Sequence, residues 1–147
     1  MANYLLILAA CVAVAAAGGR SIEGDEGEYG RFNRWRKVIC EKSEDVHKAL
    51  DTCFQKEPKL IKDAIVDCMT DVLPSSKGEA IEFTHSACKD KSLFKKLDKC
   101  FAEYEANAEF KKQLELKEEV KVCYIDVLKK FDLPQLMDYL NETSKST

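Results

Sequence analysis

The sequence contains little of the material from which enzyme and metal sites are usually built. It has only two histidines, His47 and His85, which lie far apart in the chain and outside any metal-ligand spacing. Cys-x-x-Cys and His-Glu-x-x-His patterns are absent, as are the other zinc patterns. Apart from Gly78, the glycines all precede residue 31, so no Gly-rich phosphate loop is present. We therefore expect no catalytic residue, no metal and no cofactor, and the protein is predicted not to be an enzyme.

Long apolar runs are also scarce. The one clear run, residues 4–17, is uncharged, too short to span a bilayer, and ends in three alanines. Such a run with small residues at its end is typical of a secretory signal peptide, which we place at residues 1–17. No other stretch has the length of a membrane span. The sequence therefore predicts a secreted, extracellular protein.

An excess of positive charge is absent as well. The chain has 26 acidic and 23 basic side chains and a formal net charge of −3. Nucleic-acid-binding domains usually carry a strongly basic surface. This balance argues against a nucleic acid as partner.

Cysteine is the residue type that the chain has in quantity. Seven are present, and one of them, Cys11, lies in the expected signal peptide. The other six are Cys40, Cys53, Cys68, Cys88, Cys100 and Cys123. An even number of cysteines in a small secreted chain predicts a disulfide framework, here of three bonds. Six cysteines allow 15 pairings, so the sequence leaves the connectivity open. With all six oxidised, no thiol would remain to serve as a nucleophile.

These cysteines belong to an internal repeat. Leu50, Asp51, Cys53 and Phe54 match Leu97, Asp98, Cys100 and Phe101. Further along the chain, CMTDVL at residues 68–73 matches CYIDVL at residues 123–128. We interpret the match as the duplication of a helical hairpin with three cysteines in each unit. Because three is odd, an odd number of disulfides must join the two units if all six cysteines are oxidised.

Apolar residues recur every three and four positions along both units, as expected for amphipathic helices, and no segment alternates as a strand does. The predicted fold is therefore all-α, a disulfide-stapled helical bundle of two related helical hairpins. We place a single helical domain at residues 38–140, with units at 38–74 and 79–134. Residues 18–37 are expected to form a flexible segment, first acidic and then basic, and residues 141–147 a disordered tail.

The basic part of that segment reads RFNRWRK and holds the only tryptophan. Its candidates for contact with a partner or a membrane surface are Arg31, Phe32, Arg34, Trp35, Arg36 and Lys37. Aromatic and arginine side chains are common interface anchors and also suit anionic membrane surfaces. Alternatively, Trp35 begins the first helix and packs on the bundle.

Two further sites are open to interpretation. Four aspartates recur beside the cysteines, namely Asp51, Asp71, Asp98 and Asp126. They form either ordinary solvated helix faces or an acidic binding rim. Asn141 begins an Asn-Glu-Thr sequon and is a candidate for N-glycosylation.

The combination of a signal peptide, helical body and six cysteines resembles the cysteine-containing helical proteins of arthropod haemolymph, venom and silk secretions. Insect odorant-binding proteins have three residues between their second and third cysteines, whereas fourteen lie between Cys53 and Cys68. The spacing of Cys40 and Cys53 is similar to the opening of tick microplusin-like antimicrobial proteins. The later cysteines of that family lie closer together, and its metal-binding histidines have no counterpart here. The resemblance implies no functional residues.

Three function classes follow from these observations. The first is a secreted binding or interaction protein, such as a venom or secretory-fluid component, with an extracellular protein as partner. The second is a carrier that holds a small apolar molecule between its helices. The third is a membrane-active defence protein that uses residues 31–37 at a membrane surface without spanning it.

Overall fold

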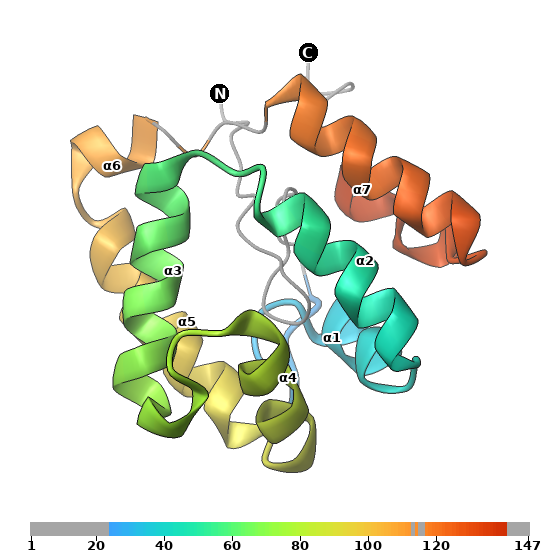
Figure 1. Cartoon of the computed structure of the whole chain (residues 1–147). Helices are drawn as coiled ribbons and strands as arrows, with labels where there is room; N and C mark the ends of the chain where they lie inside the picture. The colour runs from blue at the N-terminus through green and yellow to red at the C-terminus, as the bar shows by residue number, and fades with distance from the viewer. Residues whose placement is uncertain (1–23, 113, 115–116, 141–147) are drawn as a thin grey trace.

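The computed structural model describes residues 24–112, 114 and 117–140 (Figure 1). Its helices are α1 (Asn33–Cys40), α2 (Glu44–Phe54), α3 (Lys59–Val72), η1 (Pro74–Ser76), α4 (Ala80–Lys89), α5 (Ser92–Glu105), α6 (Ala108–Lys112), α7 (Glu118–Lys130) and η2 (Pro134–Leu136). The described residues form no strand beyond an isolated bridge between Gly27 and Gly30. The predicted all-α fold is confirmed. No helix in these ranges is both long and apolar enough to span a membrane.

The apolar period of the sequence becomes the buried side of each helix. In α3 the buried residues recur every three or four positions: Ile61, Ala64, Ile65, Cys68 and Met69. Such spacing places side chains on one face of an α-helix. Pro58 precedes the helix and Pro74 follows it, where a missing backbone N–H costs least.

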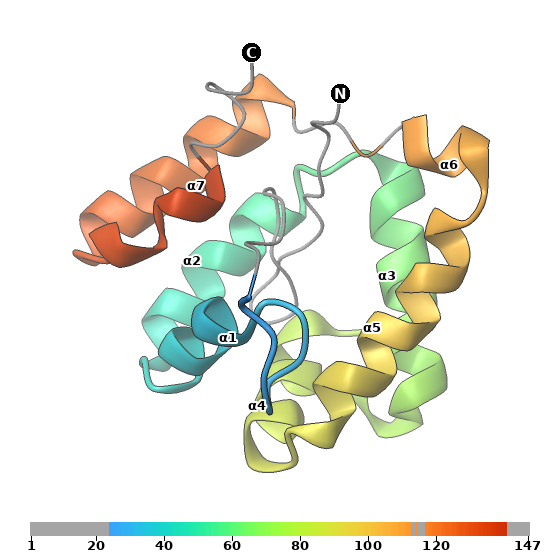
Figure 2. The same cartoon turned by 180° about the vertical axis from the view of Figure 1, so that it is seen from behind.

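Helices of one unit take their main partners from the other unit. Helix α3 packs beside α5, α2 beside α7, and α1 against α4, as both views of the molecule show (Figures 1 and 2). The two halves of each predicted hairpin are thus separated in space, with α2 and α3 on different sides of the molecule. The core lies between the pair formed by α2 and α7 and the pair formed by α3 and α5, each of which joins one helix from each unit.

All three disulfides join the two units. Cys40 is bonded to Cys88, Cys53 to Cys123, and Cys68 to Cys100. The sequence required an odd number of such crossings, and the structure has three. If the two units are exchanged, the bond between α3 and α5 becomes the bond between α7 and α2. The bond between α1 and α4 maps onto itself. The disulfide pattern therefore has the two-fold relation expected of a duplicated unit.

The structural repeat also includes α1, which lies before the unit boundary expected at residue 38. Gly30 and Gly78 each lie ten residues before the first cysteine of their unit, and both have a left-handed φ, of 91° and 76°. Each glycine is followed by a helix, α1 or α4, that ends at or next to that cysteine. Trp35 and Phe83, five residues before the respective cysteines, are both fully buried. The repeated unit therefore begins near residues 30 and 78.

One carboxyl group is buried at the turn between α2 and α3. Glu57 is only 5% exposed, and the Tyr124 hydroxyl on α7 donates a hydrogen bond of 3.4 Å to its Oε2. Burial raises the pKa of Glu57 to about 8, although Tyr124 and the charge of Lys62 oppose that rise. The protonated acid is therefore the form that the folded protein favours.

We expect Glu57→Gln to stabilise the protein at alkaline pH and to leave its stability near pH 4.5 almost unchanged. Because the folded pKa lies above the ordinary value, the contribution of Glu57 is complete below about pH 4.5 and is lost as the pH rises through about 8. At pH 8.5 the variant should gain on the order of 5 kcal/mol, since a pKa difference of one unit corresponds to about 1.4 kcal/mol. Urea unfolding of both proteins between pH 4.5 and 8.5 measures the difference. Parallel pH profiles would contradict the assignment.

Candidate functional site

The basic segment predicted as a contact surface is largely built into the fold. Phe32, Trp35 and Arg36 are buried, and the Trp35 ring packs edge-on against Tyr139 with 5.4 Å between ring centroids. Because they are buried, these three side chains are not available at the surface for the contact with a partner or membrane that the sequence suggested. From residue 24 onward the segment expected to be flexible is fastened to the bundle, for example by the backbone N–H of Arg31, which donates to Asp98 on α5 at 2.9 Å.

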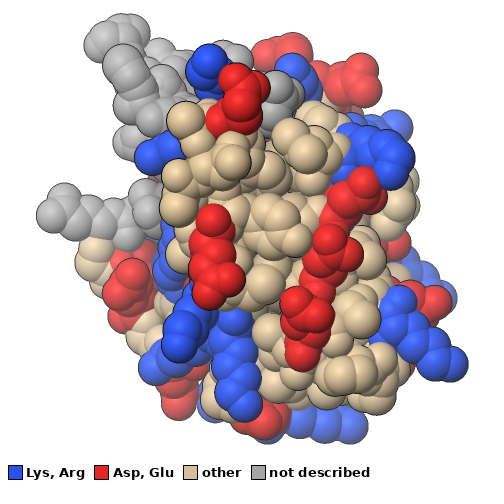
Figure 3. Space-filling view, turned by 90° about the vertical axis from the view of Figure 1, so that its left-hand side faces the viewer, with Lys and Arg blue, Asp and Glu red and all other residues tan. Residues whose placement is uncertain are grey.

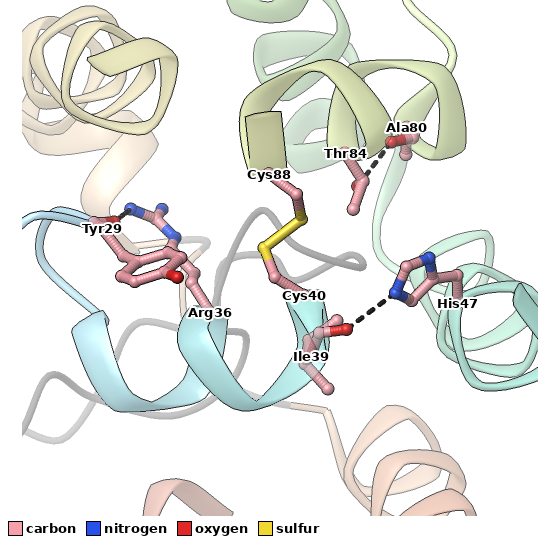
Figure 4. The surroundings of a disulfide bond; sticks show 8 residues. All are labelled: Tyr29, Arg36, Ile39, Cys40, His47, Ala80, Thr84 and Cys88. Atoms are coloured by element: carbon pink, nitrogen blue, oxygen red, sulfur yellow. Dashed lines mark hydrogen bonds between the residues drawn. A yellow bond between two sulfur atoms is a disulfide. The ribbon is translucent and has the colours of Figure 1, made fainter. Parts of the chain in front are cut away.

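Arg36 is the centre of this attachment. Its guanidinium forms two hydrogen bonds with the carboxylate of Asp98 on α5, Nη2 to Oδ1 at 2.9 Å and Nη1 to Oδ2 at 3.0 Å. Nη1 also donates to the Tyr29 carbonyl at 2.9 Å (Figure 4). The guanidinium lies 4.9 Å from the centroid of the Phe94 ring and 5.3 Å from that of Phe32. The buried cation is thus paired, hydrogen-bonded and stacked, as a buried charge must be.

The remaining basic residues of the segment lie nearer the surface. Arg31 pairs with Glu105 at 3.3 Å, and Arg34 lies 3.7 Å from Asp138. Lys37 is exposed. The segment therefore presents the basic side chains of Arg31, Arg34 and Lys37 near its surface, two of them paired with acids, while its aromatic rings are buried. The expected signal peptide at residues 1–17 and Asn141 lie outside the described residues.

The two histidines, distant in sequence, come together where α2 meets α4, and their ring centroids lie 5.9 Å apart. His47 is buried, and its Nε2 lies 2.8 Å from the Ile39 carbonyl (Figure 4). His85 Nε2 lies 3.1 Å from Glu44. In the described part of the chain, no group of three or more metal-ligating side chains is arranged to hold an ion. The ring contact of the two histidines joins α2 to α4.

A groove of about 480 Å³ opens between α2, α3 and the start of α4. Its lining residues are Asp51, Phe54, Gln55, Lys62, Asp63, Val66, Gly78, Glu79, Ala80 and Ile81. The size lies within the range of small-molecule sites. Apolar side chains and carboxylates share the lining, so the groove offers both packing surface and negative charge.

The charges of the groove are not balanced within it. The Lys62 ammonium donates to the Gln55 carbonyl at 3.0 Å, and Asp63 pairs with Lys59 at 2.7 Å. Asp51 accepts only a long hydrogen bond of 3.4 Å from the Gln55 amide. Among the described residues, neither Asp51 nor Glu79 has an ion-pair partner. Burial, opposed in part by Gln55 and reinforced by the charge of Glu79, raises the pKa of Asp51.

A second, more open hollow of about 600 Å³ lies beside the N-terminal segment and α5. Its lining residues are Glu26, Gly27, Gly30, Arg31, Lys95, Asp98, Lys99 and Ala102. Here the carboxylate of Asp98 is already occupied by Arg36 and by the backbone N–H of Arg31 at 2.9 Å. The four aspartates considered as one acidic rim are therefore distributed differently, since Asp51 and Asp98 line separate hollows while Asp71 and Asp126 are exposed.

The outer surface of α3 carries further negative charge. Asp63, Asp67 and Asp71 follow one another at four-residue spacing and are all exposed. Figure 3 shows acidic side chains on this side of the molecule with uncharged surface between them and basic side chains close to several of them. Asp67 accepts a hydrogen bond from the Tyr104 hydroxyl at 3.3 Å, so it is engaged with α5. This surface is an ordinary solvated helix face.

The groove could not be located from the sequence, although its key residue was visible there. Asp51 was one of the repeated aspartates, but only the exchanged packing of the units brings residues 78–81 against α2 and α3. Comparison with known proteins adds no name to this site, because no protein-family model, no curated protein and no solved structure matches the chain.

Proposed function

We propose that the protein is a secreted binding protein that recognises a positively charged ligand or partner at the groove between α2, α3 and α4. The observation that supports this proposal is the pair of carboxylates, Asp51 and Glu79, which line the groove and have no ion-pair partner among the described residues, since the nearby Lys62 bonds the Gln55 carbonyl. A cation bound there relieves the repulsion between the two acids. No catalytic step is part of the proposal.

The scaffold suits such a role. Three disulfides tie six helices of the bundle together, which limits reorganisation when a ligand binds. Disulfides persist in oxidising environments such as the extracellular space. Secretion, a venom or secretory-fluid role, glycosylation at Asn141 and the resemblance to arthropod secreted proteins remain predictions.

The other two function classes are less well supported. A carrier of a purely apolar molecule would require burying that molecule against Asp51 and Glu79, which costs free energy because those carboxylates would lose water. A membrane-active protein would need exposed aromatic groups in the basic segment, whereas Phe32 and Trp35 are buried. The groove therefore favours a cationic ligand, either a small molecule or a side chain of a protein.

Native mass spectrometry of the protein recovered from its own secretory fluid tests the function. We expect a bound ligand or partner that is released as salt rises, because charged contacts are screened. The Asp51→Asn/Glu79→Gln double variant should lose it, whereas Asp126→Asn, at an exposed position on α7, should retain it. A protein free of any ligand or partner would contradict the binding function. Uptake of a fluorescent apolar probe would favour the carrier, and leakage of anionic vesicles the membrane-active class.

A further inference from the structure

The groove at Asp51 and the more open hollow at Asp98 occupy equivalent positions in the two repeated units. Asp51 of the groove corresponds to Asp98, because each lies two residues before the Cys-Phe pair of its unit. Gly78 corresponds to Gly30, since both precede the first cysteine of their unit by ten residues and have left-handed φ. Both carboxylates thus lie beside the segment that leads into the first helix of a unit.

In one of these positions the carboxylate binds a guanidinium. Asp98 is held by Arg36 through two hydrogen bonds of 2.9 and 3.0 Å, the paired geometry in which a planar guanidinium matches a carboxylate. Asp98 Oδ2 also accepts the Arg31 backbone N–H. The second unit therefore shows what this carboxylate position binds when a cation is available.

In the other position, no guanidinium from the part of the chain that the structure describes pairs with the carboxylate. The counterpart of Arg36, four residues before the cysteine, is Thr84. Its short side chain is buried and donates to the Ala80 carbonyl at 2.7 Å, so it does not reach out to pair with an acid. Figure 4 shows Arg36 and Thr84 on opposite sides of the Cys40–Cys88 disulfide. The counterpart of Arg31 is Glu79. Where the first unit has a basic side chain, the groove therefore has a second acidic side chain beside Asp51.

We propose that the groove at Asp51 binds the guanidinium group of an external ligand, as the equivalent Asp98 binds the guanidinium of Arg36. This inference rests on the proposed binding function and names the chemical group that the groove takes. Asp51 accepts the two parallel N–H donors, and Glu79 adds negative charge at the rim. The Phe54 and Val66 side chains of the lining pack against the stem that carries the guanidinium. The group belongs either to an arginine side chain of a protein or to a small free guanidinium compound.

Two matched probes test the chemistry. N-acetyl-arginine amide carries a guanidinium, and N-acetyl-citrulline amide has nearly the same shape without the charge. Titration followed by amide NMR shifts is expected to move signals of the groove residues with the arginine probe alone. Asp51→Asn should weaken that binding at least tenfold, and Asp126→Asn should leave it unchanged. Equal shifts with both probes, or equal affinity in Asp51→Asn, would overturn the proposal.

The thermal unfolding of Asp51→Asn, measured beside the wild type, shows that loss of binding is not loss of the fold. Glu79→Gln provides a second variant, for which a smaller loss of affinity is expected. A lysine probe, N-acetyl-lysine amide, carries the same charge without the two parallel N–H donors of a guanidinium, and we expect it to bind more weakly. Binding as tight as that of the arginine probe would overturn the assignment of a guanidinium.

A third titration identifies the source of the guanidinium. It uses an eight-residue peptide with one central arginine and compares it with the same peptide carrying citrulline instead. Tighter binding of the arginine peptide than of the free amide assigns the site to a protein partner. Equal binding assigns it to a small compound. Failure of this proposal is distinguishable from failure of the proposed function. A natural ligand retained by the wild-type protein and lost in the double variant, with no response to any arginine probe, overturns the guanidinium alone.

Discussion

Asp98→Asn is expected to destabilise the protein by about 3 to 5 kcal/mol, the usual cost of removing one partner of a buried ion pair. The side chain of Arg36 is 1% exposed and that of Asp98 is 13% exposed, so little water reaches the pair. Without the carboxylate charge, the guanidinium would remain buried between Phe32 and Phe94 with a neutral amide in place of its counter-ion. The free energy of unfolding from urea denaturation at pH 7 measures the loss.

The repeat provides a matched control for this experiment. Asp51→Asn makes the same chemical change at the equivalent position of the other unit, where no ion pair exists among the described residues. Burial and Glu79 already disfavour the charge of Asp51. We therefore expect a change within about 0.5 kcal/mol, in the direction of greater stability. Equal destabilisation by the two substitutions would show that Asp98 does not owe its contribution to Arg36.

Loss of the disulfide between α2 and α7 should cost about 4 kcal/mol. Cys53 and Cys123 are separated by 70 residues, the longest separation of the three, and a bond that closes a long loop restricts the unfolded chain most. The double substitution Cys53→Ser/Cys123→Ser avoids a free thiol. Urea denaturation under non-reducing conditions measures the change.

The bond between α3 and α5 is the internal comparison for that experiment. Cys68 and Cys100 are separated by 32 residues, so the chain-entropy account predicts a cost smaller by somewhat less than 1 kcal/mol. The two bonds are equivalents under exchange of the units, and they therefore differ mainly in loop length. A larger cost for the shorter loop would show that native packing, and not chain entropy, decides the contribution of these bonds.

Periodicity and cysteine count were sufficient to predict the helical class and the three disulfides. Both depend on local rules, since apolar spacing selects a helix face and an even set of cysteines in a small secreted chain pairs off. The repeat was visible for the same reason, through matched motifs around Cys53 and Cys100. Its N-terminal extent was not visible, because Trp35 and Phe83 match in burial and not in identity.

The role of residues 31–37 needed the tertiary structure. From sequence, the segment had the composition of an interface, with arginines around two aromatic rings. The same composition can also attach the segment to its own fold when another helix provides a carboxylate. Asp98 provides one for Arg36, 62 residues away in the sequence. Whether an arginine faces a partner or its own chain depends on long-range contacts, and local spacing carries no information on those.

By itself, the sequence determined that the chain forms amphipathic helices, that six of its cysteines can pair in three disulfides, and that each half repeats the other. Only the tertiary structure decided that the halves exchange partners, so that α2 packs with α7 and α3 with α5. The choice between a closed hairpin and an exchanged pair depends on how whole helix faces fit together, and both arrangements bury the same stripes. That exchange also placed Asp51 opposite Gly78 and Glu79, and so created the groove on which the proposed function rests.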